Sequence, residues 1–67
     1  MHKYQLGTLL YAMNTDLGYI QAYNRDKDGL NLYDIYWFRD EHVSRGVDEW
    51  QVIRFHNLFQ TMHGRNK

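Results

Sequence analysis

The sequence predicts a mainly β domain in which four to five short antiparallel strands form a small curled sheet and a C-terminal amphipathic helix follows, over about residues 48–63. Three observations lead to this prediction. The segment 30–38, LNLYDIYWF, alternates between two faces that both carry aromatic rings, as a central strand does. Asp28-Gly29 stands between two alternating segments, which is typical of a hairpin. Beyond residue 48, apolar residues recur at the spacing of one helical face.

The other strands are predicted from alternation and from the turn-forming residues between them. The first strand is expected over 7–13 and the second over 17–23, with the hairpin tip at 24–29 joining the second to the central strand. The segment 42–47 predicts a short edge strand, because its charges and Gly46 discourage pairing with other chains.

The helix has a predicted start and a predicted buried face. Asp48 is expected to cap the first turn, with Gln51 returning the hydrogen bond as in a capping box. The expected core-facing stripe, which Trp50 and Val52 extend less regularly, consists of Phe55, Leu58, Phe59 and Met62. Gly64 is predicted to end the helix.

Length and composition limit the possible functions. A chain of 67 residues forms one domain, 1–67, whose core must rely on rings, since aromatics make up 16% of the residues. There are no cysteines, which excludes disulfides and thiolate zinc sites. Eight basic and eight acidic side chains give no net charge, whereas nucleic-acid binders usually carry a basic excess. Without a long apolar segment, a soluble protein with no membrane contact is expected.

Several short motifs carry a family resemblance over about residues 7–62. These are Gly7-x-Leu9, Leu17-Gly18-x-Ile20, Tyr33-x-Ile35-x-Trp37 and a following turn that contains Asp40. The chain resembles the small Src-homology-3-like (SH3-like) barrels, and most of all short uncharacterised proteins of tailed bacteriophages, including phages of marine bacteria and cyanobacteria. It departs from them at Arg39-Asp40-Glu41, where those proteins have Asp-Gly. The resemblance implies a non-enzymatic role in the virion or the host cytoplasm, with no catalytic residues to carry over.

Catalytic and metal sites are not expected. Asn24, Asp26, Asp28 and Gly29 imitate the start of a calcium loop, but Ile35 stands where the loop needs a bidentate glutamate. The histidines are not spaced for a shared metal, and no serine or threonine lies in a nucleophile elbow. We therefore predict no enzyme activity, no cofactor and no small-molecule substrate.

The candidate binding residues are aromatic and basic. Tyr19 and Tyr23 are expected on the face opposite Ile20, with Tyr36 joining them from the central strand. The predicted binding residues are Tyr19, Tyr23, Arg25, Tyr36 and Arg39. This cluster is interpreted as a protein-binding or self-association patch, with a stacking platform for single-stranded nucleic acid as the alternative and aromatic pairing that only stabilises the sheet as a third reading.

Overall fold

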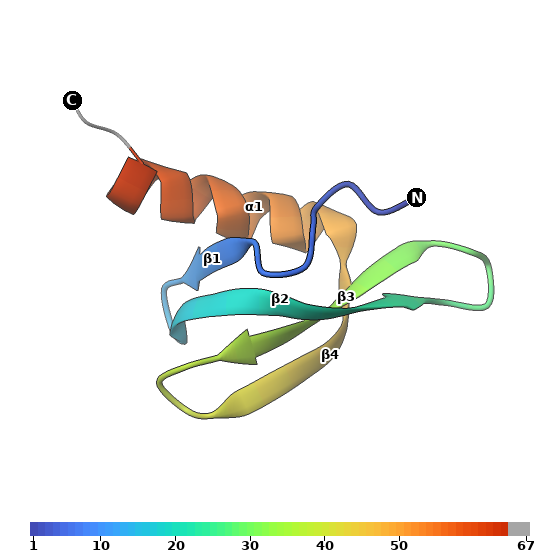
Figure 1. Ribbon diagram of the computed structural model, residues 1–67, viewed down its shortest axis with the longest axis horizontal. Coiled ribbons are helices and arrows are strands. Elements are labelled where there is room, and N and C mark those ends of the chain that lie inside the picture. The colour runs from blue at the N-terminus through green and yellow to red at the C-terminus, as the bar shows by residue number, and fades with distance from the viewer. Residues whose placement is uncertain (65–67) are drawn as a thin grey trace.

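The computed structural model describes residues 1–64 as one antiparallel sheet of four strands with a helix packed on it (Figure 1). The strands follow in the order β1 (Leu9–Ala12), β2 (Asp16–Arg25), β3 (Asn31–Trp37) and β4 (His42–Asp48). The helix α1 (Glu49–Phe59) continues into a π-helical turn, η1 (Gln60–Gly64). The predicted mainly β fold with a C-terminal helix is confirmed, and its arrangement is consistent with a small SH3-like barrel.

The core lies between the sheet and the helix, and β3 runs through its centre. β3 pairs with β2 on one side and with β4 on the other, so β1 and β4 are the two edges of an open sheet. Tyr33, Ile35 and Trp37 of β3 are buried on the inner face, as the alternation predicts. Val52 of α1 is fully buried against them. The helix therefore covers the inner face of the sheet, the face that carries the buried side chains of β3.

The helix buries less of its predicted stripe than expected. Phe55 packs against the core, with its ring 5.5 Å from that of Trp37 and nearly perpendicular to it. Met62, however, is half exposed, because it lies in η1, beyond the end of the sheet-covering helix. Trp50 is 55% exposed and does not extend the buried face. Val52 is the buried residue of α1, and Phe55 packs against the core while remaining partly exposed.

The predicted capping box is not formed. Asp48 occupies the N-cap position with extended backbone, but its side chain makes no capping hydrogen bond. Its carboxylate is exposed, and the acidic residue in the first turn is Glu49, whose charge favours the helix N-terminus. The helix therefore begins where predicted, with Asp48 at the N-cap, but the predicted capping hydrogen bond is absent.

A bulge in β2 changes which residues share a face. The register between β2 and β3 shifts between Ile20 and Ala22, so that Gln21 is an extra residue. Tyr19 pairs with Tyr36 on the outer face, whereas Tyr23 pairs with Tyr33 on the inner face. The expectation that Tyr19 and Tyr23 lie on one face is therefore wrong, because one inserted residue reverses the alternation beyond it.

A second bulge lies in the edge strand β4, and Asp34 stabilises it. Arg45 and Gly46 together stand opposite Asp34, and Gly46 has the positive φ of 67° that suits glycine. The buried Asp34 carboxylate accepts the Gly46 N–H at 3.0 Å. Arg45 approaches the same carboxylate at 3.7 Å from the solvent side.

Replacing Asp34 with alanine is expected to lower the free energy of unfolding by about 1–2 kcal/mol, because the Gly46 N–H loses its acceptor. Asp34→Asn keeps an acceptor oxygen and should lose less than half of that. Asp40→Ala, which breaks the exposed pair with Arg39, should change stability by less than about 0.5 kcal/mol. Urea unfolding of the three variants tests this order, and equal losses for Asp34→Ala and Asp40→Ala contradict it.

Candidate functional site

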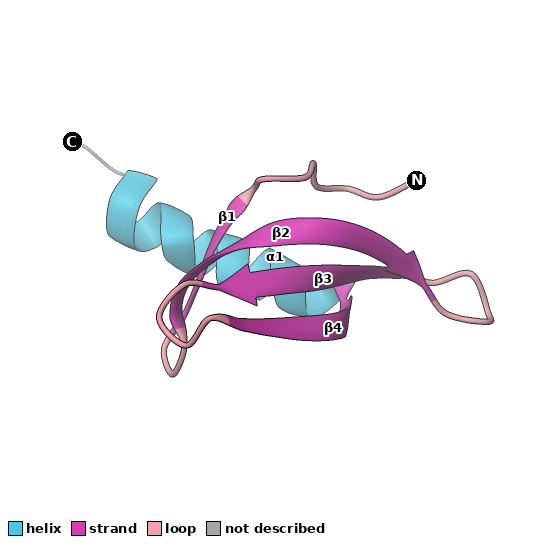
Figure 2. Ribbon diagram, turned by 60° about the horizontal axis from the view of Figure 1, so that its bottom comes forward, coloured by secondary structure: helices cyan, strands magenta, loops and turns pink. Residues whose placement is uncertain are grey.

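The outer face of the sheet is the candidate site, because α1 lies on the other face only (Figure 2). The strand registers place one apolar row across all four strands. Leu9 of β1 stands beside Tyr19 of β2, which stands beside Tyr36 of β3, which stands beside Val43 of β4. An open antiparallel sheet normally presents polar side chains to water on such a face. The row is therefore unusual for a face without a covering layer.

Three rings form the centre of this face. We call Tyr19, Tyr36 and Phe38 the outer aromatic cluster. The ring of Tyr19 lies 5.7 Å from that of Tyr36 and 5.5 Å from that of Phe38. The rings of Tyr36 and Phe38 meet edge to face at 5.5 Å. Phe38 remains 47% exposed and Leu9 39% exposed, so the rings stabilise one another and still present apolar surface to solvent.

The cations beside the outer aromatic cluster are paired. Arg39 forms an exposed ion pair with Asp40 at 3.4 Å and donates a hydrogen bond to the Asn14 carbonyl. Arg45 faces the Asp34 carboxylate. Arg39 thus lies in the turn directly after Phe38, as expected, but its charge is balanced locally. The face is apolar at its centre and close to neutral at these two positions.

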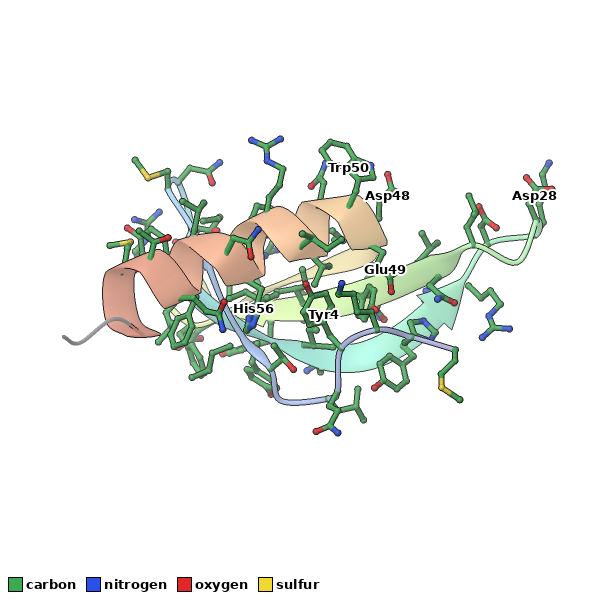
Figure 3. All side chains as sticks on the ribbon, turned by 90° about the horizontal axis from the view of Figure 1, so that it is seen from above. Tyr4, Asp28, Asp48, Glu49, Trp50 and His56 are labelled. Atoms are coloured by element: carbon green, nitrogen blue, oxygen red, sulfur yellow. The ribbon has the colours of Figure 1, made fainter. Side chains whose placement is uncertain are left out.

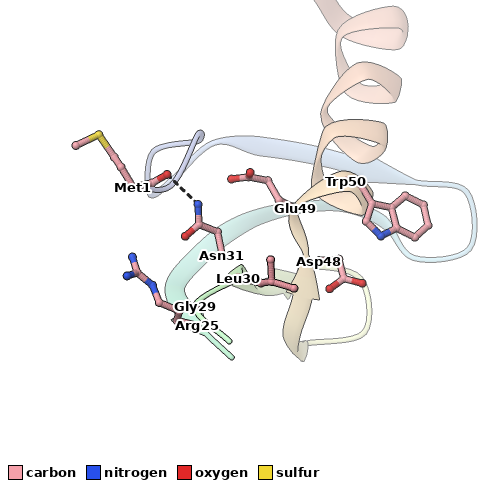
Figure 4. A pocket seen from close by; sticks show the side chains of 8 residues that line it. All are labelled: Met1, Arg25, Gly29, Leu30, Asn31, Asp48, Glu49 and Trp50. Atoms are coloured by element: carbon pink, nitrogen blue, oxygen red, sulfur yellow. Dashed lines mark hydrogen bonds between the residues drawn. The ribbon is translucent and has the colours of Figure 1, made fainter. Parts of the chain in front are cut away.

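Tyr23 and Arg25 belong to a different part of the molecule. Tyr23 stacks on the His2 ring at 4.2 Å and donates a hydrogen bond from its hydroxyl to the Tyr4 carbonyl at 2.7 Å. Arg25 lines a pocket of about 370 Å³ at the base of the β2–β3 hairpin (Figure 4). Its neighbours there include Asp48, Glu49 and Trp50. The structure therefore brings Tyr19, Tyr36 and Arg39 to one region and separates Tyr23 and Arg25 from them.

A partly buried hydrogen-bond network holds the N-terminal arm against β3 and the start of α1. The Tyr33 hydroxyl donates to the Glu49 carboxylate and accepts the backbone N–H groups of Lys3 at 3.0 Å and Tyr4 at 3.3 Å. In Figure 3, Glu49 lies on the side of α1 that faces Tyr4 of the N-terminal arm, whereas Trp50 and Asp48 lie on the opposite side of the helix. Residues 1–8 are thus attached to both β3 and the helix start.

The network shifts the pKa values of both its titratable groups. Burial, together with the hydrogen bond to Glu49, raises the pKa of Tyr33 to about 12. The hydrogen bonds from Tyr33 and from the Lys3 N–H lower the pKa of Glu49 below its ordinary value of 4.5. Both shifts preserve a neutral phenol that donates to a charged carboxylate.

Sequence reasoning missed two members of the candidate site, Phe38 and Leu9. Alternation along 30–38 already predicts Phe38 on the same face as Tyr36, but Phe38 was not among the predicted binding residues. Leu9 could not be predicted in this way, because its place depends on the register of β1 against β2. Within residues 1–64, no group of three or more His, Cys, Asp or Glu side chains is arranged to hold a metal ion.

No helix in the described part of the chain is long and apolar enough to cross a membrane. Comparison of the chain with known proteins found no matching family model, no similar curated protein and no similar solved structure.

Proposed function

We propose that this chain is a non-catalytic binding domain that acts through protein–protein contacts, and that the outer aromatic cluster with Leu9 and Val43 is its contact surface. The observation that carries the proposal is an apolar, aromatic row on a sheet face that neither helical element of residues 1–64 covers. Contiguous exposed apolar surface of this kind marks interaction sites, and tyrosine is enriched among residues that dominate binding energy.

The charges around the cluster favour a protein partner over nucleic acid. Stacking platforms for single strands combine rings with cations that are available to phosphates. Here Tyr23 and Arg25 lie away from the cluster, while Arg39 and Arg45 each face a carboxylate. The chain as a whole has no net charge. Phosphate contacts would therefore contribute little affinity.

The resemblance to the small SH3-like barrels of tailed bacteriophages gives the proposal its biological setting. A virion accessory protein or a modulator of a host protein needs a binding surface rather than an active site. The partner, on this proposal, is a phage or host protein that contacts the outer aromatic cluster. A second copy of the chain is the alternative partner, which the absence of net charge permits.

The experiment compares two variants with the same change of charge at similarly exposed apolar positions. Phe38→Glu adds a charge to the outer aromatic cluster, and Leu30→Glu adds one at the hairpin, where Leu30 is 61% exposed. We expect Phe38→Glu to weaken partner capture from phage or host extracts about tenfold, as loss of a central ring contact does. Leu30→Glu should bind like the wild type, and capture should persist at high salt.

Equal binding by wild type and Phe38→Glu, with both variants melting normally, contradicts the proposed contact surface. The nucleic-acid alternative is tested in parallel by titrating a fluorescent single-stranded oligonucleotide at low ionic strength. Binding that falls steeply with salt would favour that alternative. Sedimentation of the purified protein over a range of concentrations detects self-association.

A further inference from the structure

Two aspartates at the tip of the β2–β3 hairpin, Asp26 and Asp28, have different surroundings. Asp26 begins a tight turn in which the Gly29 N–H donates to the Asp26 carbonyl at 3.0 Å, and the Asp26 N–H donates to the Leu30 carbonyl at 3.1 Å. One oxygen of the Asp26 carboxylate, Oδ1, accepts the N–H groups of Asp28 and Leu30, both at 2.9 Å. This one side chain therefore fixes the backbone of the loop on both sides of Gly29.

The Asp28 carboxylate is free, in contrast to that of Asp26. Asp28 is exposed, and within residues 1–64 its side chain makes no hydrogen bond or ion pair. Figure 3 shows it at the far end of the hairpin, away from the helix. The next residue, Gly29, is also exposed and has no atom within 4 Å of the position that a Cβ would occupy. A free carboxyl group thus stands next to an unhindered backbone nitrogen.

This pair of residues allows a covalent change whose only co-reactant is water. The Gly29 nitrogen attacks Cγ of the protonated Asp28 carboxyl group and forms an N–Cγ bond, while the carboxyl hydroxyl leaves as water together with the nitrogen proton. The product is a succinimide ring. Water then adds to the main-chain carbonyl carbon of Asp28 and breaks the bond from that carbon to the Gly29 nitrogen. Gly29 is now joined through Cγ, so residue 28 has become an isoaspartyl residue of unchanged mass.

The observed turn opposes the first step of this reaction. The Gly29 N–H is bonded to the Asp26 carbonyl, whereas ring closure requires the nitrogen to turn towards Cγ of Asp28 and to lose its proton. The Asp26 carboxylate restrains that rotation because it holds the N–H groups of the residues on either side of Gly29. We propose that Asp28-Gly29 is a site of spontaneous isoaspartate formation and that the Asp26 carboxylate, as a positioning group, keeps the reaction slow.

The modification changes the hairpin and not the proposed contact surface. An isoaspartyl residue lengthens the main chain at position 28, and the two residues that follow it, Gly29 and Leu30, line the pocket at the base of the hairpin. Phe38 of the outer aromatic cluster follows the opposite end of β3. The inference therefore does not rest on the proposed function, and either can fail without the other.

Incubation of the purified protein at physiological temperature and pH, sampled over several weeks, tests the inference. Peptide mapping with mass spectrometry measures the isoaspartyl fraction at residue 28, because isoaspartyl peptides separate from aspartyl peptides and resist an aspartate-specific protease. We expect Asp26→Ala to accumulate isoaspartate about tenfold faster than the wild type, since the loop loses two hydrogen bonds to its backbone. Asp26→Asn retains an acceptor oxygen and should stay within about twofold of the wild type.

Two further variants separate this local effect from other causes. Asp28→Glu would have to close a larger ring and should show no isomerisation at residue 28. Asp34→Ala weakens the pairing of β3 with β4 rather than the hairpin loop, so it should leave the rate at residue 28 unchanged. The inference is overturned if wild type and Asp26→Ala show the same rate or no isoaspartate, if Asp34→Ala or Asp26→Asn accelerates the reaction as much as Asp26→Ala, or if the signal persists in Asp28→Glu.

Discussion

Replacing Gly18 with alanine is expected to lower the free energy of unfolding by about 3 kcal/mol, at the upper end of the usual cost of overpacking a core. A Cβ atom at this position would lie 2.5 Å from Cε3 of Trp37 and 2.6 Å from the carbonyl oxygen of Tyr36. Neither neighbour can move easily, since the Trp37 ring is buried and the carbonyl belongs to the central strand. The loss should lower the melting temperature by at least 10 °C or so in a domain of this size.

Gly29→Ala is the matched control for this prediction. Gly29 has a positive φ of 83° but no atom within 4 Å of its added Cβ. Its replacement should cost only the backbone strain of a left-handed residue, about 1 kcal/mol. If thermal melting shows Gly18→Ala to be no less stable than Gly29→Ala, the Trp37 ring does not pack on the Gly18 backbone in the way described.

Tyr33→Phe should also remove about 2 kcal/mol of stability, because one hydroxyl bonds to three groups and one of those bonds is to a charged carboxylate. The change leaves the Glu49 carboxylate without its phenol donor and the Tyr4 N–H without its acceptor, whereas the Lys3 N–H keeps its hydrogen bond to the Glu49 carboxylate at 3.1 Å. A buried hydrogen bond to a charged group contributes about 1.5–3 kcal/mol, and each unpaired buried group adds a desolvation cost. Tyr36→Phe keeps a ring in the outer aromatic cluster and should change stability by less than about 0.5 kcal/mol. Denaturant unfolding of both variants provides the measurement.

The same network makes stability depend on pH at both extremes. The pKa of Tyr33 is raised to about 12 in the folded protein, so its contribution is complete below the ordinary value of 10.0 and is lost as the pH rises towards 12. The pKa of Glu49 is lowered, so its contribution is complete above 4.5 and is lost as the pH falls through the folded value. Tyr33→Phe should reduce both dependences. If the free energy of unfolding of the variant changes with acid and alkaline pH as it does in the wild type, the network does not couple to folding.

The local pattern of residues was enough to predict most of the fold. Strict alternation in LNLYDIYWF predicted a central strand with Tyr33, Ile35 and Trp37 inside, because the side-chain period of a strand needs no knowledge of its neighbours. Asp28-Gly29 predicted the hairpin for a similar reason, since Gly29 supplies the positive φ that the turn requires. The outer position of Tyr19 and Tyr36 also followed from alternation alone.

Only the tertiary structure decided which tyrosines share a face and which acidic side chain is used. The bulge at Gln21 moves Tyr23 to the inner face, and nothing in the segment 17–23 by itself marks where the strand must bend to follow β3. Glu49, rather than Asp48, became the important carboxylate because the Tyr33 hydroxyl reaches it from a strand distant in sequence. Periodicity fixes the local conformation of each segment, whereas register and contact between segments depend on how the whole core packs.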